Sequence, residues 1–254
     1  MNHDAAMAVV DGTEILWAAH SERYSKVKND HYLNNEIVNE ARDIGWHKVV
    51  YYERPMLKKT RQFYAGQYGI AVDSKEMPQH HLNQFGIKID EYVTHHDSHA
   101  SAGYFTSGFK DAVILTVDAI GEWDTASIST ANKIWIQRKE TIQYPHSLGI
   151  LYSAFTQRCG LKPAEEEYIL MGMAAYGEPK YKEDIYNDFV HQSPFKLKQN
   201  LHRGLGDWHP EADPMDLAAS IQAVTEECLA DLWKRASRYG SRNLVYAGGV
   251  ALNC

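Results

Sequence analysis

Two histidines lie four positions apart in a histidine-rich run of the chain. His95 and His99 have the spacing that places two imidazoles on one face of a helix, about one turn apart. Imidazoles at that separation can share a metal ion. The same spacing also fits histidines that cover a helix or pack in a core, so the pair alone leaves both interpretations open. In either case His96 and Asp97 should point elsewhere.

A carboxylate follows the strongest strand signal in the sequence. Residues 112–117 form a continuous apolar run without helical periodicity, which indicates a buried strand ending at Asp118. Two imidazoles and one carboxylate suit iron, manganese or zinc, with positions left open for a substrate. The sequence therefore predicts a metal site formed by His95, His99 and Asp118.

Glycines follow two of the expected strands. Gly121 lies in the loop DAIGE, which joins two strands, and Gly248 and Gly249 follow an expected strand at 244–247. Without a Cβ, such glycines let backbone N–H groups approach phosphate oxygens or an adenine ring. A tight turn with no ligand is the alternative at each place.

Charged residues near the N-terminus form two further candidate sites. Arg23 lies in the charged segment ERYSK and is suited to bind an anion such as a phosphate, although a solvated surface loop has the same composition. His3 and Asp4 come directly before the first expected strand. A His–Asp pair can activate a hydroxyl by general-base action. Disorder is the alternative for a pair so close to a terminus.

The elements that must position these residues alternate between strands and helices, which indicates an α/β protein. A β-hairpin is expected over residues 5–19, with its turn at Asp11-Gly12. Residues 181–210 are expected to be irregular. Strands are further expected at 48–52, 112–117, 125–130, 133–137 and 244–247, and helices at 34–44, from about 97, at 147–159, 163–173 and 215–238.

Composition argues against several classes of protein. The chain has 254 residues and a formal net charge of −7, whereas a nucleic-acid-binding surface is normally basic. Its 3 cysteines include no CxxC pair, which favours a reducing cytoplasm over a disulfide framework. No apolar run approaches the roughly 18 residues of a membrane span. We therefore expect a cytoplasmic protein that binds neither nucleic acid nor a membrane.

Seven segments, in this order, resemble the NodU/CmcH carbamoyltransferases, and the similarity runs essentially end to end. The segments are NHDAAMAVVDG, SERYSKVK, HHDSHASAGYFTSGF, VDAIGEWDTASI, YPHSLGILYSAFTQRCG, EEEYILMGMAAYGEPKY and LVYAGGVALNC. The resemblance implies the N-terminal portion of a Kae-type domain. Its fold would be actin/Hsp70/sugar-kinase-like (ribonuclease H-like), with a first lobe at about 1–140 and the start of a second at about 141–254.

The resemblance also implies a reaction. In this family a YrdC-like domain makes carbamoyl-adenylate from carbamoyl phosphate and ATP, and the Kae-type domain transfers the carbamoyl group to a hydroxyl of a small-molecule acceptor. The metal ligands would be His95, His99 and Asp118, with iron expected and manganese or zinc as alternatives. The remaining site residues implied are His3 and Asp4 at the acceptor end, and Gly121, Gly248, Gly249, Asn253 and Arg23 toward the nucleotide.

The chain departs from the family pattern at three places. Ile169 stands where the family usually has lysine, which removes a cation. Ala119 replaces the commoner glycine, so we expect backbone strain there. Only two residues precede His3, and no YrdC-like segment is present, so we expect a fragment, one product of a split gene or a degraded relative.

Two other functions remain open at this point. A Kae-type tRNA threonylcarbamoyl transferase would share the histidine pair. A non-catalytic remnant that binds a metal or nucleotide would explain the missing parts, and such a remnant would expose apolar surface through which it could form a homodimer.

Overall fold

The computed structural model describes residues 4–191 and 193–253 and is a mixed α/β protein with small sheets flanked by helices. The chain forms two compact units, which divide between His95 and His96. This division falls within the first turn of one continuous helix, α6 (His95–Thr106), so His95 is carried by the same helix as His99. The two lobes expected from the family fold, at about 1–140 and 141–254, stay a prediction.

The first unit opens with the predicted hairpin. Strands β1 and β2 pair antiparallel, and Asp11 faces Glu14 across the turn. The predicted helix at 34–44 is confirmed as α2 (Asn35–Ile44). The Asn34 side chain caps it by accepting a hydrogen bond from the Ile37 N–H at 3.0 Å. The elements are β1 (Ala6–Asp11), β2 (Glu14–His20), α1 (Glu22–Ser25), α2 (Asn35–Ile44), β3 (Val50–Tyr51), α3 (Pro55–Tyr64), α4 (Tyr68–Val72), the 3-10 helix η1 (Ser74–Glu76), α5 (Pro78–Asn83) and β4 (Glu91–Tyr92).

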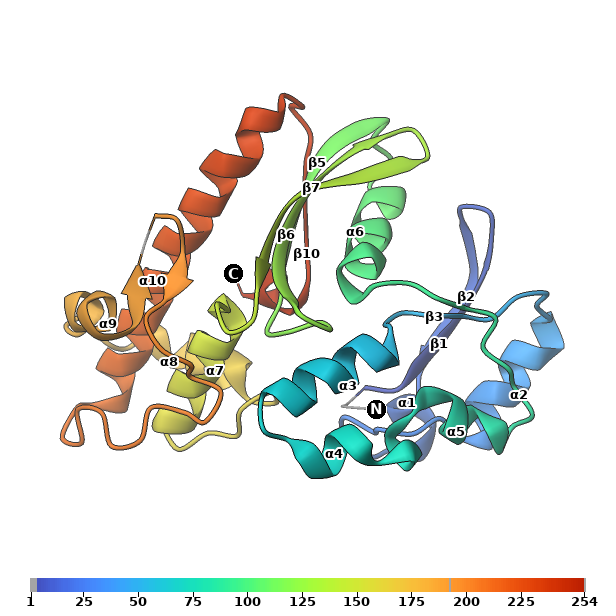
Figure 1. The fold of residues 1–254 in the computed structure, drawn as a ribbon, viewed down its shortest axis with the longest axis horizontal. Coiled ribbons are helices and arrows are strands. Elements are labelled where there is room, and N and C mark those ends of the chain that lie inside the picture. The colour runs from blue at the N-terminus through green and yellow to red at the C-terminus, as the bar shows by residue number, and fades with distance from the viewer. Residues whose placement is uncertain (1–3, 192, 254) are drawn as a thin grey trace. The chain divides into compact units, whose positions relative to one another are not determined.

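The second unit contains most of α6 and a four-stranded sheet (Figure 1). After α6 its elements are β5 (Asp111–Val117), β6 (Asp124–Asn132), β7 (Trp135–Gln143), α7 (Leu148–Arg158), α8 (Glu167–Ala174), α9 (Lys182–Phe189), β8 (Val190–His191), β9 (Lys196–Leu197), α10 (Pro214–Ala236), the 3-10 helix η2 (Ser237–Tyr239), β10 (Leu244–Ala247) and the 3-10 helix η3 (Gly249–Leu252).

The sheet has the order β10-β5-β6-β7. Strands β5, β6 and β7 are antiparallel neighbours, whereas β10 pairs parallel to β5, with Ala247 opposite Thr116. Because parallel strands end at the same edge of a sheet, the residues that follow β5 and β10 meet there. That edge carries Asp118 and the glycines 248 and 249.

Helices cover both faces of this sheet, with α6 and α10 on opposite sides of it (Figure 1). On one face, Ala100 and Tyr104 of α6 pack against Ile114 of β5. On the other, Leu232 of α10 borders the same small void as Leu115 of β5. Six of the seven β5 residues are therefore buried, which explains the uninterrupted apolar run in the sequence.

One expectation for the second unit is wrong. Residues 181–210 were expected to be irregular, but they contain α9 and the small hairpin of β8 and β9. Helix α9 forms because Ile185 and Phe189, four positions apart, are both buried. This short apolar pair was the available signal. The strand expected at 133–137 is also displaced, since β7 spans Trp135–Gln143.

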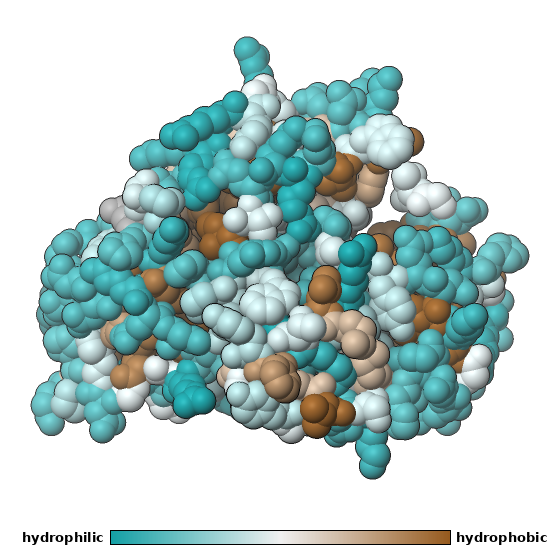
Figure 2. All heavy atoms as spheres, viewed as in Figure 1, coloured by the Kyte–Doolittle hydropathy of each residue, from teal (hydrophilic) through white to brown (hydrophobic). Residues whose placement is uncertain are grey.

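Among the described residues, no helix combines the length and the apolar character needed to cross a membrane. The face drawn in Figure 2 is mostly hydrophilic, with hydrophobic residues in small separate patches.

Candidate metal centre

The first turn of α6 and the end of β5 bring the three predicted ligands together. His95 and His99 each offer a ring nitrogen, and Asp118 offers a carboxylate oxygen, all within 4.8 Å of one another. His99 Nε2 lies 3.0 Å from Asp118 Oδ2. All three residues are partly buried, so the group is screened from bulk water yet open to an ion.

Two of the three residues between the candidate histidine ligands point elsewhere, as the helical spacing predicted. His96 is fully buried, with Nδ1 2.7 Å from Thr116 Oγ1 and Nε2 3.0 Å from the carbonyl oxygen of Asp124. Asp97 forms an ion pair with Arg138, which also contacts Asp124. His96 and Asp97 therefore attach the helix to the sheet, whereas their neighbours face the candidate site.

Hydrogen bonds hold the Asp118 carboxylate and its backbone. Oδ1 accepts the Ala119 N–H at 2.7 Å, and the Asp118 N–H donates to the Thr125 carbonyl at 2.9 Å. Ser147, the N-cap of α7, donates from Oγ to the Ala119 carbonyl at 2.5 Å. Ala119 is not among the described residues with a positive φ, so the strain expected from its replacing glycine is not present.

Glycines let three backbone segments converge beside Asp118. A Cβ on Gly149 would lie 2.6 Å from Ala119 Cα, and one on Gly248 would lie 2.3 Å from the Val117 carbonyl oxygen. A Cβ on Gly249 would lie 2.8 Å from Asp118 Oδ1. Gly248 also has a φ of 98°, which other residues rarely adopt. These contacts explain why glycine occurs at these three positions.

Other predicted nucleotide-side residues have defined local partners. The Gly121 N–H donates to the Asp124 carbonyl at 2.8 Å and so closes the loop between β5 and β6. The Asn253 side chain is paired with Gln222 of α10, donating at 3.1 Å and accepting at 2.8 Å. Ile169 lies in α8, the helix predicted over 163–173. Nucleotide roles for Gly121, Gly248, Gly249 and Asn253 stay predictions.

The remaining predicted residues belong to the N-terminal unit. Arg23 is in α1, where its guanidinium lies 4.0 Å from Glu22 and is 80% exposed. Asp4 lines a cavity of about 270 Å³ together with residues of β1 and β3. His3 lies outside the described residues. The proposed roles of Arg23, His3 and Asp4 stay predictions.

Glu53, which follows β3 closely, was not singled out from the sequence. Its buried carboxylate has Oε2 3.8 Å from His95 Nδ1 and Oε1 2.6 Å from Lys58 Nζ. Burial by itself raises the pKa of Glu53, but the contacts with His95 and Lys58 outweigh it and hold the pKa below its ordinary value. An acidic residue just after a short strand was the signal in the sequence.

The donor set fits a first-row divalent metal ion. Two imidazole nitrogens and one carboxylate oxygen are ligands that iron, manganese and zinc all accept, and three protein ligands leave positions for a substrate. The donors alone do not distinguish among these ions. The group could hold a metal ion, and its identity stays a prediction.

Comparisons with known proteins match most of the chain. A model of the carbamoyltransferase N-terminus family matches residues 80–254. An uncharacterized protein of Synechocystis is 32% identical over 99% of this chain and 50% of its own length. Nodulation protein NolNO of Sinorhizobium fredii is 25% identical over 99% of this chain and 41% of its own length. The chain thus spans half or less of the length of these relatives.

Proposed function

The chain belongs to the carbamoyltransferase N-terminus family, as its seven sequence segments predicted, and we propose that it transfers a carbamoyl group to a hydroxyl of a small-molecule acceptor. The donor in this proposal is carbamoyl-adenylate, made from carbamoyl phosphate and ATP. The observation that carries the proposal is the grouping of His95, His99 and Asp118 at the strand edge where Gly248 and Gly249 follow β10.

The proposed fold is that of the actin/Hsp70/sugar-kinase superfamily. Its support is the order of the large sheet, in which an antiparallel β5-β6-β7 meander is continued by the parallel strand β10. Strand β10 comes after a helical crossover that includes α10. In such sheets, ligands bind beyond the carboxyl ends of parallel strands.

Each part of the site has a defined task in this proposal. His95, His99 and Asp118 hold the ion, which when bound would polarise the carbamoyl carbonyl and stabilise charge that develops on it. His96 and Arg138 keep α6 on the sheet, so the two histidine ligands stay in register with Asp118. The backbone at Gly248 and Gly249 offers close approach to the adenylate. His3 and Asp4 are the proposed pair that accepts the proton of the acceptor hydroxyl.

A transfer assay tests the proposal. The protein is incubated with radiolabelled carbamoyl phosphate, ATP, Fe²⁺, Mn²⁺ or Zn²⁺, and a panel of hydroxylated acceptors, with and without a separately purified YrdC-like domain. We expect label in an acceptor when carbamoyl-adenylate is supplied, and loss of transfer in His95→Ala/His99→Ala. Absence of transfer despite verified carbamoyl-adenylate would contradict the proposal.

The same assay separates the related tRNA reaction. If label from threonylcarbamoyl-adenylate entered tRNA and no small acceptor was modified, the tRNA-modifying alternative would replace the proposed function. The net charge of −7 argues against that outcome, because tRNA binding is strengthened by basic surfaces.

A further inference from the structure

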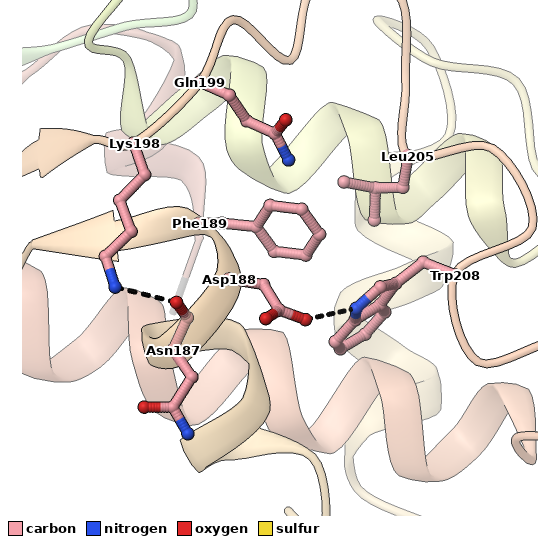
Figure 3. Close-up of a pocket in the computed structure, with 7 residues that line it drawn as sticks. All are labelled: Asn187, Asp188, Phe189, Lys198, Gln199, Leu205 and Trp208. Atoms are coloured by element: carbon pink, nitrogen blue, oxygen red, sulfur yellow. Dashed lines mark hydrogen bonds between the residues drawn. The ribbon is translucent and has the colours of Figure 1, made fainter.

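A second hollow, in the C-terminal unit, has the composition of a small-molecule site. It has a volume of about 480 Å³, within the range of about 300–1,000 Å³ that is usual for such sites. We call it the Trp208 pocket; it is lined by Asn187, Asp188, Phe189, Lys198, Gln199, Leu205 and Trp208 (Figure 3). None of these residues belongs to the candidate metal centre.

The indole of Trp208 is held in one orientation. Its Nε1 donates to Asp188 Oδ2 at 2.8 Å. The ring packs at steep angles against four other rings, with centroid distances of 4.3 Å to His209, 5.2 Å to Phe189, 5.4 Å to Phe155 and 6.3 Å to Tyr181. Arg158 fixes the backbone beneath it, because Nε donates to the Trp208 carbonyl at 2.7 Å. A half-buried aromatic wall that is already ordered loses little conformational entropy when a ligand stacks on it.

Polar groups of several kinds stand around that wall. Lys198 Nζ donates to the Asn187 carbonyl at 2.7 Å and so is oriented at the rim, where its other N–H groups are available to a ligand. The amides of Asn187 and Gln199 each offer both donors and an acceptor. Figure 3 shows the Gln199 amide, the Phe189 ring and the Leu205 side chain turned toward a common space.

The charges of the lining cancel. Asp188 and Lys198 are its only formally charged side chains, one of each sign, among the residues that line the hollow. A phosphate would meet the Asp188 carboxylate, and an ammonium group would meet Lys198. A neutral ligand with many hydroxyls, which both donate and accept, suits such a lining better than an ion does.

From these observations we propose that the Trp208 pocket binds a neutral carbohydrate ring. A pyranose has a C–H face that can lie on the indole and hydroxyls around its edge that can reach Asp188, Lys198 and Gln199. This inference stands apart from carbamoyl transfer, because it requires only that the pocket recognise a sugar.

The test is a binding titration by isothermal calorimetry with glucose, N-acetylglucosamine, their β-1,4-linked disaccharides and AMP. At least one saccharide should bind, and Trp208→Ala should weaken that binding about tenfold or more, as is typical for a central aromatic contact. Trp233→Phe is the matched control, because Trp233 of α10 packs on Tyr246 of β10 and does not line the pocket; it should leave saccharide binding unchanged.

Because Trp208 also packs against Phe155, a second variant avoids the buried cluster. Lys198→Ala/Gln199→Ala removes two exposed rim side chains and should weaken saccharide binding severalfold with unchanged unfolding temperature. The proposal is overturned if no saccharide binds, if both pocket variants bind saccharides as the wild type does, or if AMP alone binds and loses affinity in Trp208→Ala.

Discussion

The metal centre and the Trp208 pocket are built from the chain in different ways. Two of the three candidate metal ligands lie about one helical turn apart, and the third directly follows a buried strand. The Trp208 pocket instead collects side chains from α9, the segment after β9 and the loop before α10. A site whose residues lie on strongly patterned elements can be inferred from residue spacing, whereas a pocket lined largely by loop residues depends on how those loops pack.

A second contrast lies within the metal centre itself. The histidines in the run from His95 to His99 lie in two different environments. His95 and His99 face the candidate site, whereas His96 is buried between the helix and the sheet. Identical side chains thus face the candidate metal site or bind the sheet, according to the helix face that they occupy. The predictions below separate these two kinds of histidine.

Removal of both histidine ligands should have the largest effect. In His95→Ala/His99→Ala we expect metal affinity to fall by about 100-fold or more, because even outer partners of metal ligands contribute about 10–100-fold. Metal content after dialysis against limiting chelator, measured by plasma mass spectrometry, checks this. His191→Ala, an exposed histidine on β8, serves as control and should retain wild-type metal content.

Replacement of the structural histidine should give the opposite pattern. His96→Ala should lower the free energy of unfolding by about 2–3 kcal/mol, because it leaves a cavity and removes partners of Thr116 and of the Asp124 carbonyl. Urea unfolding followed by circular dichroism measures this loss. Metal content per folded molecule should stay close to the wild-type value. Wild-type stability combined with lost metal would show that His96 is itself a ligand.

A methyl group beside Asp118 should lower the metal affinity but change the stability of the fold little. In Gly249→Ala the new Cβ would lie 2.8 Å from Asp118 Oδ1, so the carboxylate must shift. We expect metal affinity to fall about tenfold, which corresponds to about 1.4 kcal/mol. The free energy of unfolding should change by less than about 1 kcal/mol, because the displaced atom belongs to a side chain. Unchanged metal affinity would argue that Asp118 can shift without cost.

The smallest expected effect concerns the pH dependence of stability and Glu140, which belongs to neither site. Burial raises the pKa of Glu140, but hydrogen bonds from Arg235 and Tyr239 outweigh it and hold the pKa below its ordinary value of 4.5. Since the folded pKa is the lower one, the stabilisation is present above pH 4.5 and is lost as pH falls through the folded pKa.

Glu140→Gln should therefore lose less stability than the wild type between neutral and acid pH. The difference should be less than about 1 kcal/mol, because the Glu140–Arg235 pair is partly exposed. Unfolding temperatures from pH 7 down to pH 3 measure this effect. Glu211→Gln, an exposed glutamate in the loop before α10, should leave the acid-side slope as in the wild type. A steeper slope in Glu140→Gln would reverse the inferred direction.

Local sequence determined much of this protein. The turn at Asp11-Gly12, the cap at Asn34, the buried run of β5 and the apolar face of α10 each specified an element, because helix and strand periods are visible over a few residues. The spacing of His95 and His99 also fixed which side chains share a helix face. Helix α9 was missed because its apolar signal is limited to Ile185 and Phe189.

Only the tertiary structure decided what meets across long distances in sequence. That Gly249 lies against Asp118 follows from the parallel pairing of β10 with β5, strands separated by more than a hundred positions, and no local pattern encodes such a pairing. The Trp208 pocket has the same origin, because its indole is oriented by Asp188, Phe155 and Arg158 from other elements. Side-chain spacing is a local property of the chain, while convergence depends on how all the elements pack together.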